Sequence, residues 1–167
     1  LMPAATQSHA RVIDFQKDAG AVPNDFTLPT AWKNGGLMNA TLASLAAGDT
    51  LFIPNATFHV MGGIAAHNLH GVTIQLDGTL HFSNDTKAWP RDSHGRVHEC
   101  LYFYNASDIT FTSSGTGTLN GNGNAWWGVP GIGYLVRGEN RPRLMHIDGG
   151  SKRVLLEHWL LKDSPYW

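Results

Sequence analysis

The sequence predicts an all-β protein built as a parallel β-solenoid. The composition supports this prediction, because 19 glycines and a charged fraction of only 15% in 167 residues indicate many turns and few surface helices. Short segments alternate apolar and polar residues, so each buries one face. These segments recur along the chain with long insertions between them, which is typical of a coil with loops on one side. An antiparallel sandwich is the alternative, and it would show turn signals every 8–12 residues or so.

The N-terminal part of the chain is expected to contain one strand and one helix. The strand is predicted over 11–15, "RVIDF", and the proline, glycine and asparagine residues of 18–30 are expected to break it. A helix is predicted over 37–47, with Gly48 at its C-terminal cap. The apolar residues on one face of this helix are Leu37, Ala40, Leu42 and Leu45.

The rest of the chain repeats one unit, an apolar-x-apolar strand followed by a corner of small residues and a second short strand. Ile53 and Ile74 are 21 residues apart, and later repeats are spread further by insertions. We expect one residue of each repeat to stack in a shared interior column: Ile53, Ile74, Phe111 and Leu156.

Two insertions, 83–99 and 123–144, are too long for hairpins, and long loops on a rigid scaffold commonly carry function. The two insertions contain the arginines Arg91, Arg96, Arg137, Arg141 and Arg143. Arginine side chains suit a polyanionic ligand, but they can equally hydrogen-bond loop carbonyls, and the sequence leaves both interpretations open.

Charge and hydropathy exclude several classes of protein. The net charge of −1 gives no basic footprint for nucleic acid, and no run of 18 apolar residues exists to span a membrane. Cys100 is the only cysteine, so we expect a small buried apolar residue, or a partner on a segment outside this chain. No cofactor and no metal are expected. The pairs His67/His70 and His94/His98 lack the cysteines or the glutamate of known zinc motifs, and exposed loop histidines are the simpler interpretation.

Four sequons of the form N-x-[ST] indicate a eukaryotic secretory route and a secreted protein. The start "LMPAATQSHA" has no basic region followed by an apolar run, so we expect any signal peptide to have been removed already. The candidate glycosylation sites are Asn39, Asn55, Asn84 and Asn105.

Several motifs occur in an order that resembles the polygalacturonase-like proteins of glycoside hydrolase family 28. They are "VIDFQKDAGAVPND", "GDTLFIPN", "GTGTLNGNGNAWWG", "NRPRL" and "RVLLEHWLLKDSPYW". The resemblance covers 12–167 and implies a right-handed parallel β-helix capped by an N-terminal helix. It implies that 1–167 is a single domain, comprising the cap and the first coils and incomplete at its C-terminal end. The glycine- and asparagine-rich stretch 117–128, "GTLNGNGNAWWG", is then expected to form a corner anchored by Trp126 and Trp127. Alternatively, the two tryptophans form a platform on which a sugar stacks.

The resemblance also implies inverting hydrolysis of α-1,4-galacturonosidic bonds in pectin or polygalacturonan. Inversion needs an acid and a base about 6.5–9.5 Å apart. The family's "NTD", "DD", "GHG" and "RIK" motifs are absent here, so no catalytic residue is expected before Trp167. Asp163 and Arg141 are candidates for the substrate cleft, although Asp163 can instead cap a turn. Asp77, Asp108 and Asp148 are interpreted as turn residues.

Two functions follow as hypotheses. In the first, the chain is the N-terminal part of a secreted glycoside hydrolase whose substrate is polygalacturonan. In the second, it is a non-catalytic extracellular β-helix that serves as a structural or glycan-binding module. In both, an open last coil would expose apolar surface and unpaired backbone. We therefore expect further coils, or a partner chain, to cover the C-terminal end.

Overall fold

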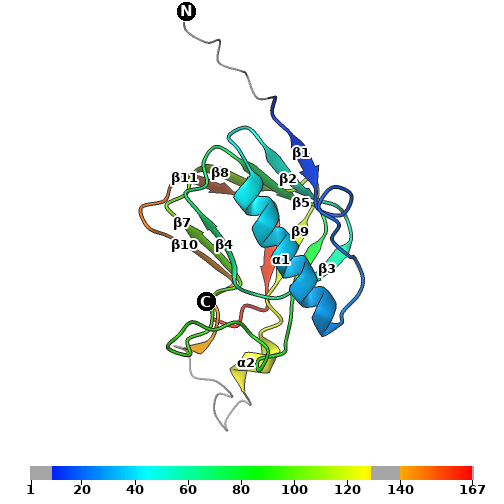
Figure 1. Ribbon diagram of the computed structural model, residues 1–167, viewed down its shortest axis with the longest axis vertical. Helices are drawn as coiled ribbons and strands as arrows, with labels where there is room; N and C mark the ends of the chain where they lie inside the picture. Colours follow the sequence, from blue (N-terminus) through cyan, green and yellow to red (C-terminus); the bar gives the residue numbers. More distant parts are fainter. Residues whose placement is uncertain (1–8, 129–139, 167) are drawn as a thin grey trace, which may run out of the picture.

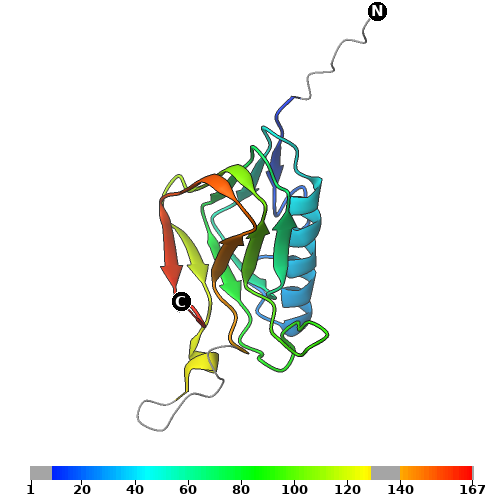
Figure 2. The same cartoon turned by 90° about the vertical axis from the view of Figure 1, so that its left-hand side faces the viewer.

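The computed structural model, which describes residues 9–128 and 140–166, is a parallel β-helix (Figures 1 and 2). Each complete coil contributes one strand to each of three sheets, and every ladder between coils is parallel. The five-stranded sheet contains β1 (Val12–Asp14), β2 (Thr50–Ile53), β5 (Thr73–Leu76), β8 (Ser107–Thr112) and β11 (Lys152–Leu156). The four-stranded sheet contains β3 (Thr57–Val60), β6 (Thr79–Phe82), β9 (Gly117–Asn120) and β12 (Trp159–Lys162). The three-stranded sheet contains β4 (Ile64–His67), β7 (Leu101–Tyr104) and β10 (Met145–Asp148). The predicted fold class is confirmed.

The interior column differs from the predicted one by a single member. Ile74 lies between Leu51 and Phe111, and Leu156 follows Phe111. Ile53 instead pairs with Leu76, in the neighbouring column. The two inward positions of β2 are two residues apart, so strand alternation alone cannot distinguish a register from one shifted by two.

The predicted helix is present but begins nine residues before the expected start. Helix α1 spans Leu28–Ser44 rather than 37–47. Thr27 is its N-cap, and the Thr27 hydroxyl accepts a hydrogen bond from the Thr30 amide at 3.4 Å. Pro29 lies in the first turn, where its missing N–H costs nothing. Residues 18–30, which were expected only to end the first strand, therefore contain the start signal of the helix.

The helix ends at Ser44 with Leu45 as its C-cap, before the glycine that was predicted to cap it. Gly48, at φ 92°, serves the next corner, where its amide donates to the carbonyl of Gly71 at 2.7 Å. Helix α1 packs on β3 and β4, the first strands of their sheets, and so covers the N-terminal end of the coil (Figure 2). The expected N-terminal cap is confirmed.

At the opposite end the interior of the last described coil is open. Leu156 is 41% exposed, although Phe111, its neighbour in the column, is fully buried. Ile147 on β10 is 37% exposed, whereas Phe103, its partner on β7, is 2% exposed. The inward side chains of this coil thus form an uncovered apolar surface.

The stretch "GTLNGNGNAWWG" forms a corner, as the packing interpretation predicts. It comprises β9 and the short helix α2 (Asn124–Trp127). Trp126 is fully buried with its ring 5.3 Å from that of Trp89. Trp127 donates from Nε1 to the carbonyl of Ser164 at 2.9 Å. Both tryptophans therefore anchor this corner to neighbouring segments.

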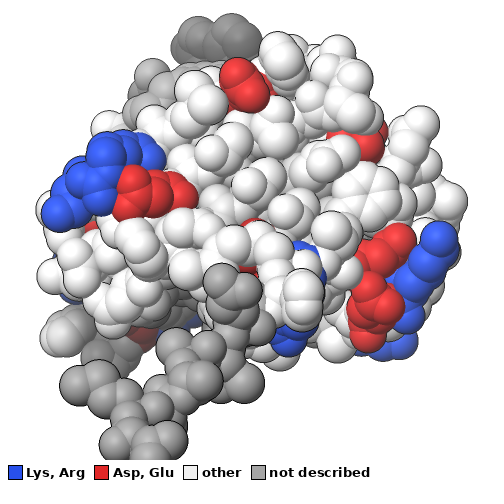
Figure 3. All heavy atoms as spheres, turned by 90° about the horizontal axis from the view of Figure 1, so that it is seen from above, with Lys and Arg blue, Asp and Glu red and all other residues white. Residues whose placement is uncertain are grey.

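Cys100 is fully buried, and burial raises the pKa of its thiol well above the ordinary value. It behaves as the small apolar residue that the sequence indicated. Figure 3 shows one face of the molecule on which basic and acidic side chains gather in a few mixed clusters separated by uncharged surface. Among the described residues, no helix combines the length and apolarity needed to cross a bilayer.

Two histidines stack on the outer side of the four-stranded sheet. His59 and His81 are partners in the β3–β6 ladder, and their rings lie 5.7 Å apart. The ring of Phe26 lies 5.6 Å from the first and 5.5 Å from the second. Burial lowers the pKa of both histidines, although Asp25 near His59 and Asp163 near His81 act in the opposite direction.

This pair predicts a loss of stability in mild acid. Because the folded state lowers both pKa values, the unfolded chain binds more protons, and stability falls as the pH drops below about 6.5. We expect urea unfolding to show a lower free energy of unfolding at pH 5 than at pH 7. In His81→Asn the difference in the free energy of unfolding is expected to shrink, because one partly buried titrating group is gone. Equal pH sensitivity of the variant and the wild type would contradict this assignment.

Candidate functional site

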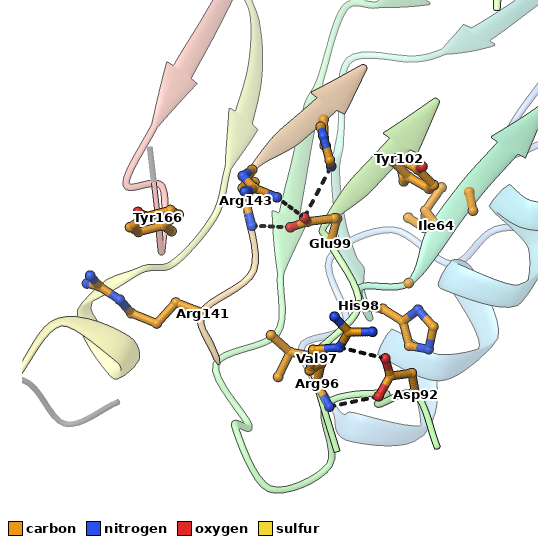
Figure 4. Close-up of a pocket in the computed structure, with 13 residues that line it drawn as sticks. Ile64, Asp92, Arg96, Val97, His98, Glu99, Tyr102, Arg141, Arg143 and Tyr166 are labelled. Carbon is orange, nitrogen blue, oxygen red and sulfur yellow. Dashed lines mark hydrogen bonds and ion pairs between the residues drawn. The ribbon is translucent and has the colours of Figure 1, made fainter. Parts of the chain in front are cut away.

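A cleft of about 750 Å³ lies beside the three-stranded sheet (Figure 4). One wall comes from the insertion between β6 and β7, and another from the segment that leads into β10. The floor adjoins the start of β4 and the outer side of β7. Its polar and aromatic lining includes Arg96, Arg141, Arg143, Tyr102, His146 and Tyr166.

Glu99 organises the centre of this cleft. Its carboxylate accepts from Arg143 Nη1 at 2.7 Å and from the Arg143 main-chain amide. The same carboxylate lies 3.3 Å from His146 Nδ1. The Arg143 side chain keeps 47% of its surface exposed, so a guanidinium with five donors retains several for a ligand.

The wall formed by the first insertion is a folded turn. Asp92 accepts from the main-chain amides of His94 at 2.8 Å and Arg96 at 2.9 Å, and from Arg96 Nε at 3.0 Å. These hydrogen bonds, with that of the Arg96 amide the largest cause, lower the pKa of Asp92. Trp89 closes the base of the turn by donating from Nε1 to the carbonyl of His98 at 2.8 Å. The wall is thus held by its own polar contacts.

The two residues predicted to line the cleft do not lie together. Arg141 lines it, with its guanidinium 5.2 Å from the centre of the Tyr166 ring, a cation–π distance. Asp163 is not part of the lining. Its carbonyl accepts from the Gly123 amide at 2.8 Å, and its carboxylate lies 3.8 Å from Lys162 Nζ.

The other arginines of the two insertions differ in role: one supports its loop and another lines the cleft. Arg91 donates to the carbonyls of Gly95 at 3.0 Å and Thr86 at 3.3 Å, so it supports the loop. Arg96 lines the cleft while paired with a carboxylate of its own turn. Arg137 lies outside the described residues.

An aromatic surface on the three-stranded sheet continues from the cleft, and the sequence reasoning missed it. The outward residue Tyr102 pairs with His146, and their rings lie 5.1 Å apart. Tyr104 pairs with His67 at a ring distance of 5.8 Å and is 43% exposed. The alternation in "LYFY" contained the signal, because Leu101 and Phe103 point inward. Loss of solvent, with Asp148 nearby, raises the pKa of Tyr102, so its hydroxyl stays a neutral donor.

Of the three carboxylates interpreted as turn residues, Asp77 and Asp148 hold turns, whereas Asp108 lies in β8 and joins neighbouring coils. Asp77 accepts from the Ser114 amide at 2.8 Å and the Ser114 hydroxyl at 2.6 Å. Asp108 forms a two-point ion pair with Arg153, at 2.5 and 2.7 Å. Asp148 accepts from the Gly149 amide at 2.7 Å.

The histidine pairs do not assemble a metal centre in the part of the chain that the structure describes, where no three His, Cys, Asp or Glu residues lie close enough to hold an ion. His70 does approach a serine and an aspartate. Its Nδ1 lies 2.8 Å from the Ser107 hydroxyl and 3.3 Å from the Asp108 carboxylate. Both contacts use the same nitrogen, whereas a proton relay needs one partner on each.

The four sequons differ in how their side-chain amides are used. Asn39 donates to the Gly63 carbonyl at 3.1 Å and accepts from the Ala65 amide at 2.8 Å. Asn105 donates to the side chain of Asn68 at 2.7 Å. Asn55 and Asn84 are exposed. Asn105 is exposed as well, whereas Asn39 is partly buried. Glycosylation stays a prediction for all four, and it is sterically simplest at the three exposed sites.

Comparison with solved structures supports the parallel β-helix fold. An iota-carrageenase complexed to iota-carrageenan fragments has a TM-score of 0.52 and 18% identity, with 93% of this chain and 30% of that chain covered. No protein-family profile matches the chain.

Sequence relatives are more specific. An exopolygalacturonase of Cochliobolus carbonum is 24% identical over 135 residues, covering 80% of this chain and 29% of its own length. An exopolygalacturonase X-2 of Emericella nidulans is 25% identical, covering 80% and 29%. An alpha-L-rhamnosidase rgxB of Aspergillus niger is 26% identical over 157 residues, covering 92% and 34%. The resemblance to polygalacturonase-like proteins is confirmed. The chain spans about a third of the length of these relatives.

Proposed function

We propose that this chain forms the N-terminal part of a secreted glycoside hydrolase that acts on polygalacturonan, and that its cleft binds the acidic glycan. The observation that carries the proposal is the combination of Arg141 and Arg143 with the aromatic rings of Tyr102 and His146 on one outer surface. A guanidinium matches the geometry of a uronate carboxylate, and an aromatic face packs against a sugar ring.

The chemistry itself requires carboxylates that the cleft does not offer in a free form. Asp92 is paired with Arg96, and Glu99 is paired with Arg143. We therefore assign the inverting acid and base to coils that stack on β10, β11 and β12. Adjacent coils lie about 4.8 Å apart, so carboxylates on neighbouring coils can meet the separation of about 6.5–9.5 Å that inversion needs.

The exposed apolar interior of the last described coil supports this assignment. Further coils would bury Ile147 and Leu156, which are now 37% and 41% exposed. Burying apolar side chains of this size contributes about 1.5–3 kcal/mol each relative to full exposure. A partner chain on the same surface would serve equally for stability, but only a continuing coil would extend the three-stranded sheet and its cleft.

A glycan-binding module without catalysis is the second candidate. The ion pairing of both cleft carboxylates favours it, because a paired carboxylate is a poor general base. An assay of the complete protein for reducing ends released from polygalacturonate separates the two functions. Release supports the hydrolase, whereas binding without release supports the module.

The cationic side of the cleft gives a binding prediction. Replacing Arg143 with glutamine is expected to weaken the affinity for tetragalacturonate by about tenfold to a hundredfold, because a hydrogen bond to a charged group contributes about 1.5–3 kcal/mol. Titration calorimetry on both proteins measures this change.

Arg153→Gln is the matched control. Arg153 is similarly exposed and is also paired with a carboxylate, but on Asp108 and outside the cleft lining. It loses an ion pair without touching the proposed site, so its affinity is expected to equal that of the wild type. Equal losses in the two variants would refute the placement of the site.

A further inference from the structure

A second, smaller hollow adjoins the cleft across the end of the first insertion. Its volume is about 220 Å³, and it is lined by Trp32, Gly36, Pro90, Gly63 and His98 among others. The last two residues also line the cleft, so the two depressions share a wall. Pockets for drug-sized ligands measure about 300–1,000 Å³, so this hollow suits a single sugar ring.

Trp32 gives the hollow an aromatic side. It lies in the first part of α1 and is 45% exposed, although burial of such a large apolar ring would be favourable. Gly36 follows four residues later, and side chains with this spacing share one face of a helix. The exposed indole therefore stands beside a position that carries no side chain.

The glycine at position 36 has no packing explanation. A Cβ on its neighbour Gly35 would lie 2.9 Å from the carbonyl oxygen of Met61, so close approach of helix and strand requires that glycine. A Cβ on Gly36 would meet nothing within 4 Å. Glycine inside a helix is destabilising relative to alanine. Glycine at position 36 thus lowers the stability of the helix although an alanine would fit there. The methyl group of that alanine would project into the space beside Trp32.

The two depressions differ in charge. The lining of the cleft contains three arginines and two carboxylates, Asp92 and Glu99, so arginines are in excess, whereas that of the hollow contains no Lys, Arg, Asp or Glu side chain. An acidic sugar is favoured in the first, and an uncharged ring that stacks on an indole is favoured in the second. Because the depressions share Gly63 and His98, adjacent residues of one glycan can occupy both.

We propose that the hollow at Trp32 binds a neutral sugar residue joined to the uronate held in the cleft. The ligand of the site is then a galacturonan segment in which a neutral sugar adjoins a uronate. This inference rests on the proposed function, because it takes the uronate in the cleft as given. Trp32 supplies the stacking surface, and Gly36 keeps the floor open.

The test compares two probes by titration calorimetry, tetragalacturonate and a tetrasaccharide of alternating galacturonate and rhamnose. We expect Trp32→Ala to weaken binding of the alternating probe about tenfold and to leave tetragalacturonate binding unchanged. Lys33→Ala, on the adjacent exposed position of the same helix, is the control and is expected to change neither affinity.

Gly36→Ala separates binding from folding. The variant is expected to raise the Tm by about 2 °C, because alanine favours the helix, while weakening the alternating probe alone. Unchanged binding of both probes in both variants, or an equal loss for both probes, overturns the subsite. If the wild type binds tetragalacturonate but its affinity for the alternating probe does not depend on Trp32, the subsite fails and the proposed function stands. If the wild type binds neither probe, both fail.

Discussion

Replacing Phe111 with alanine is expected to lower the free energy of unfolding by about 4 kcal/mol. Its side chain is fully buried in the interior column between Ile74 and Leu156. Its ring meets that of Phe103 edge-on at 5.0 Å and that of Trp159 at 5.3 Å. Truncation removes these contacts and leaves a cavity that closely packed coils cannot fill. Urea unfolding followed by circular dichroism measures the change.

Leu156→Ala is the matched control, because Leu156 occupies the next level of the same column. It is 41% exposed, so truncation removes fewer contacts and creates no enclosed cavity. A loss of only about 1 kcal/mol is expected. Similar losses of unfolding free energy in the two variants would contradict the claim that Phe111 is buried in the column while Leu156 is exposed at its open end.

Replacing Gly117 with alanine is expected to cost at least about 3 kcal/mol or to prevent folding. A Cβ at this position would lie 1.9 Å from the carbonyl oxygen of Leu76 on the preceding coil. Because the obstacle is main chain, no side-chain rotation can relieve it, and β9 must move away from the end of β5. The thermal midpoint and the yield of soluble protein measure the effect.

Gly115→Ala tests the same chemistry two residues away. A Cβ there would meet nothing within 4 Å, and its φ is not in the left-handed region. Stability is expected to stay within about 0.5 kcal/mol of the wild type. If Gly117→Ala lowered the stability as little as Gly115→Ala, the close approach of Gly117 to the Leu76 carbonyl would be incorrect.

The sequence predicted the class of fold because strand alternation is a local signal. It did not predict the register, since Leu51 and Ile53 are both inward positions and the alternation is the same for either. The sequence also did not predict the helix start. Thr27 and Pro29 form a recognisable cap, but the glycine, proline and asparagine residues just before them indicate a loop.

The candidate site was only partly predictable. Arg141 lines the cleft, because it belongs to a long insertion beside the sheet, and its contact with substrate stays a prediction. The direction of Asp163 depends on its φ of 48°, which sequence does not show. The contact of Glu99 with Arg143 joins segments 44 residues apart, and nothing local marks either residue for the other. Such pairs emerge only when coils stack.

The most direct test of the central claim is amide hydrogen exchange of the protein with and without saturating tetragalacturonate. The account predicts slower exchange in β7, in β10 and in the adjoining turn at residues 92–99, with no change in β3 and β6. Protection confined to β3 and β6, or no protection anywhere, would contradict a glycan site on the three-stranded sheet.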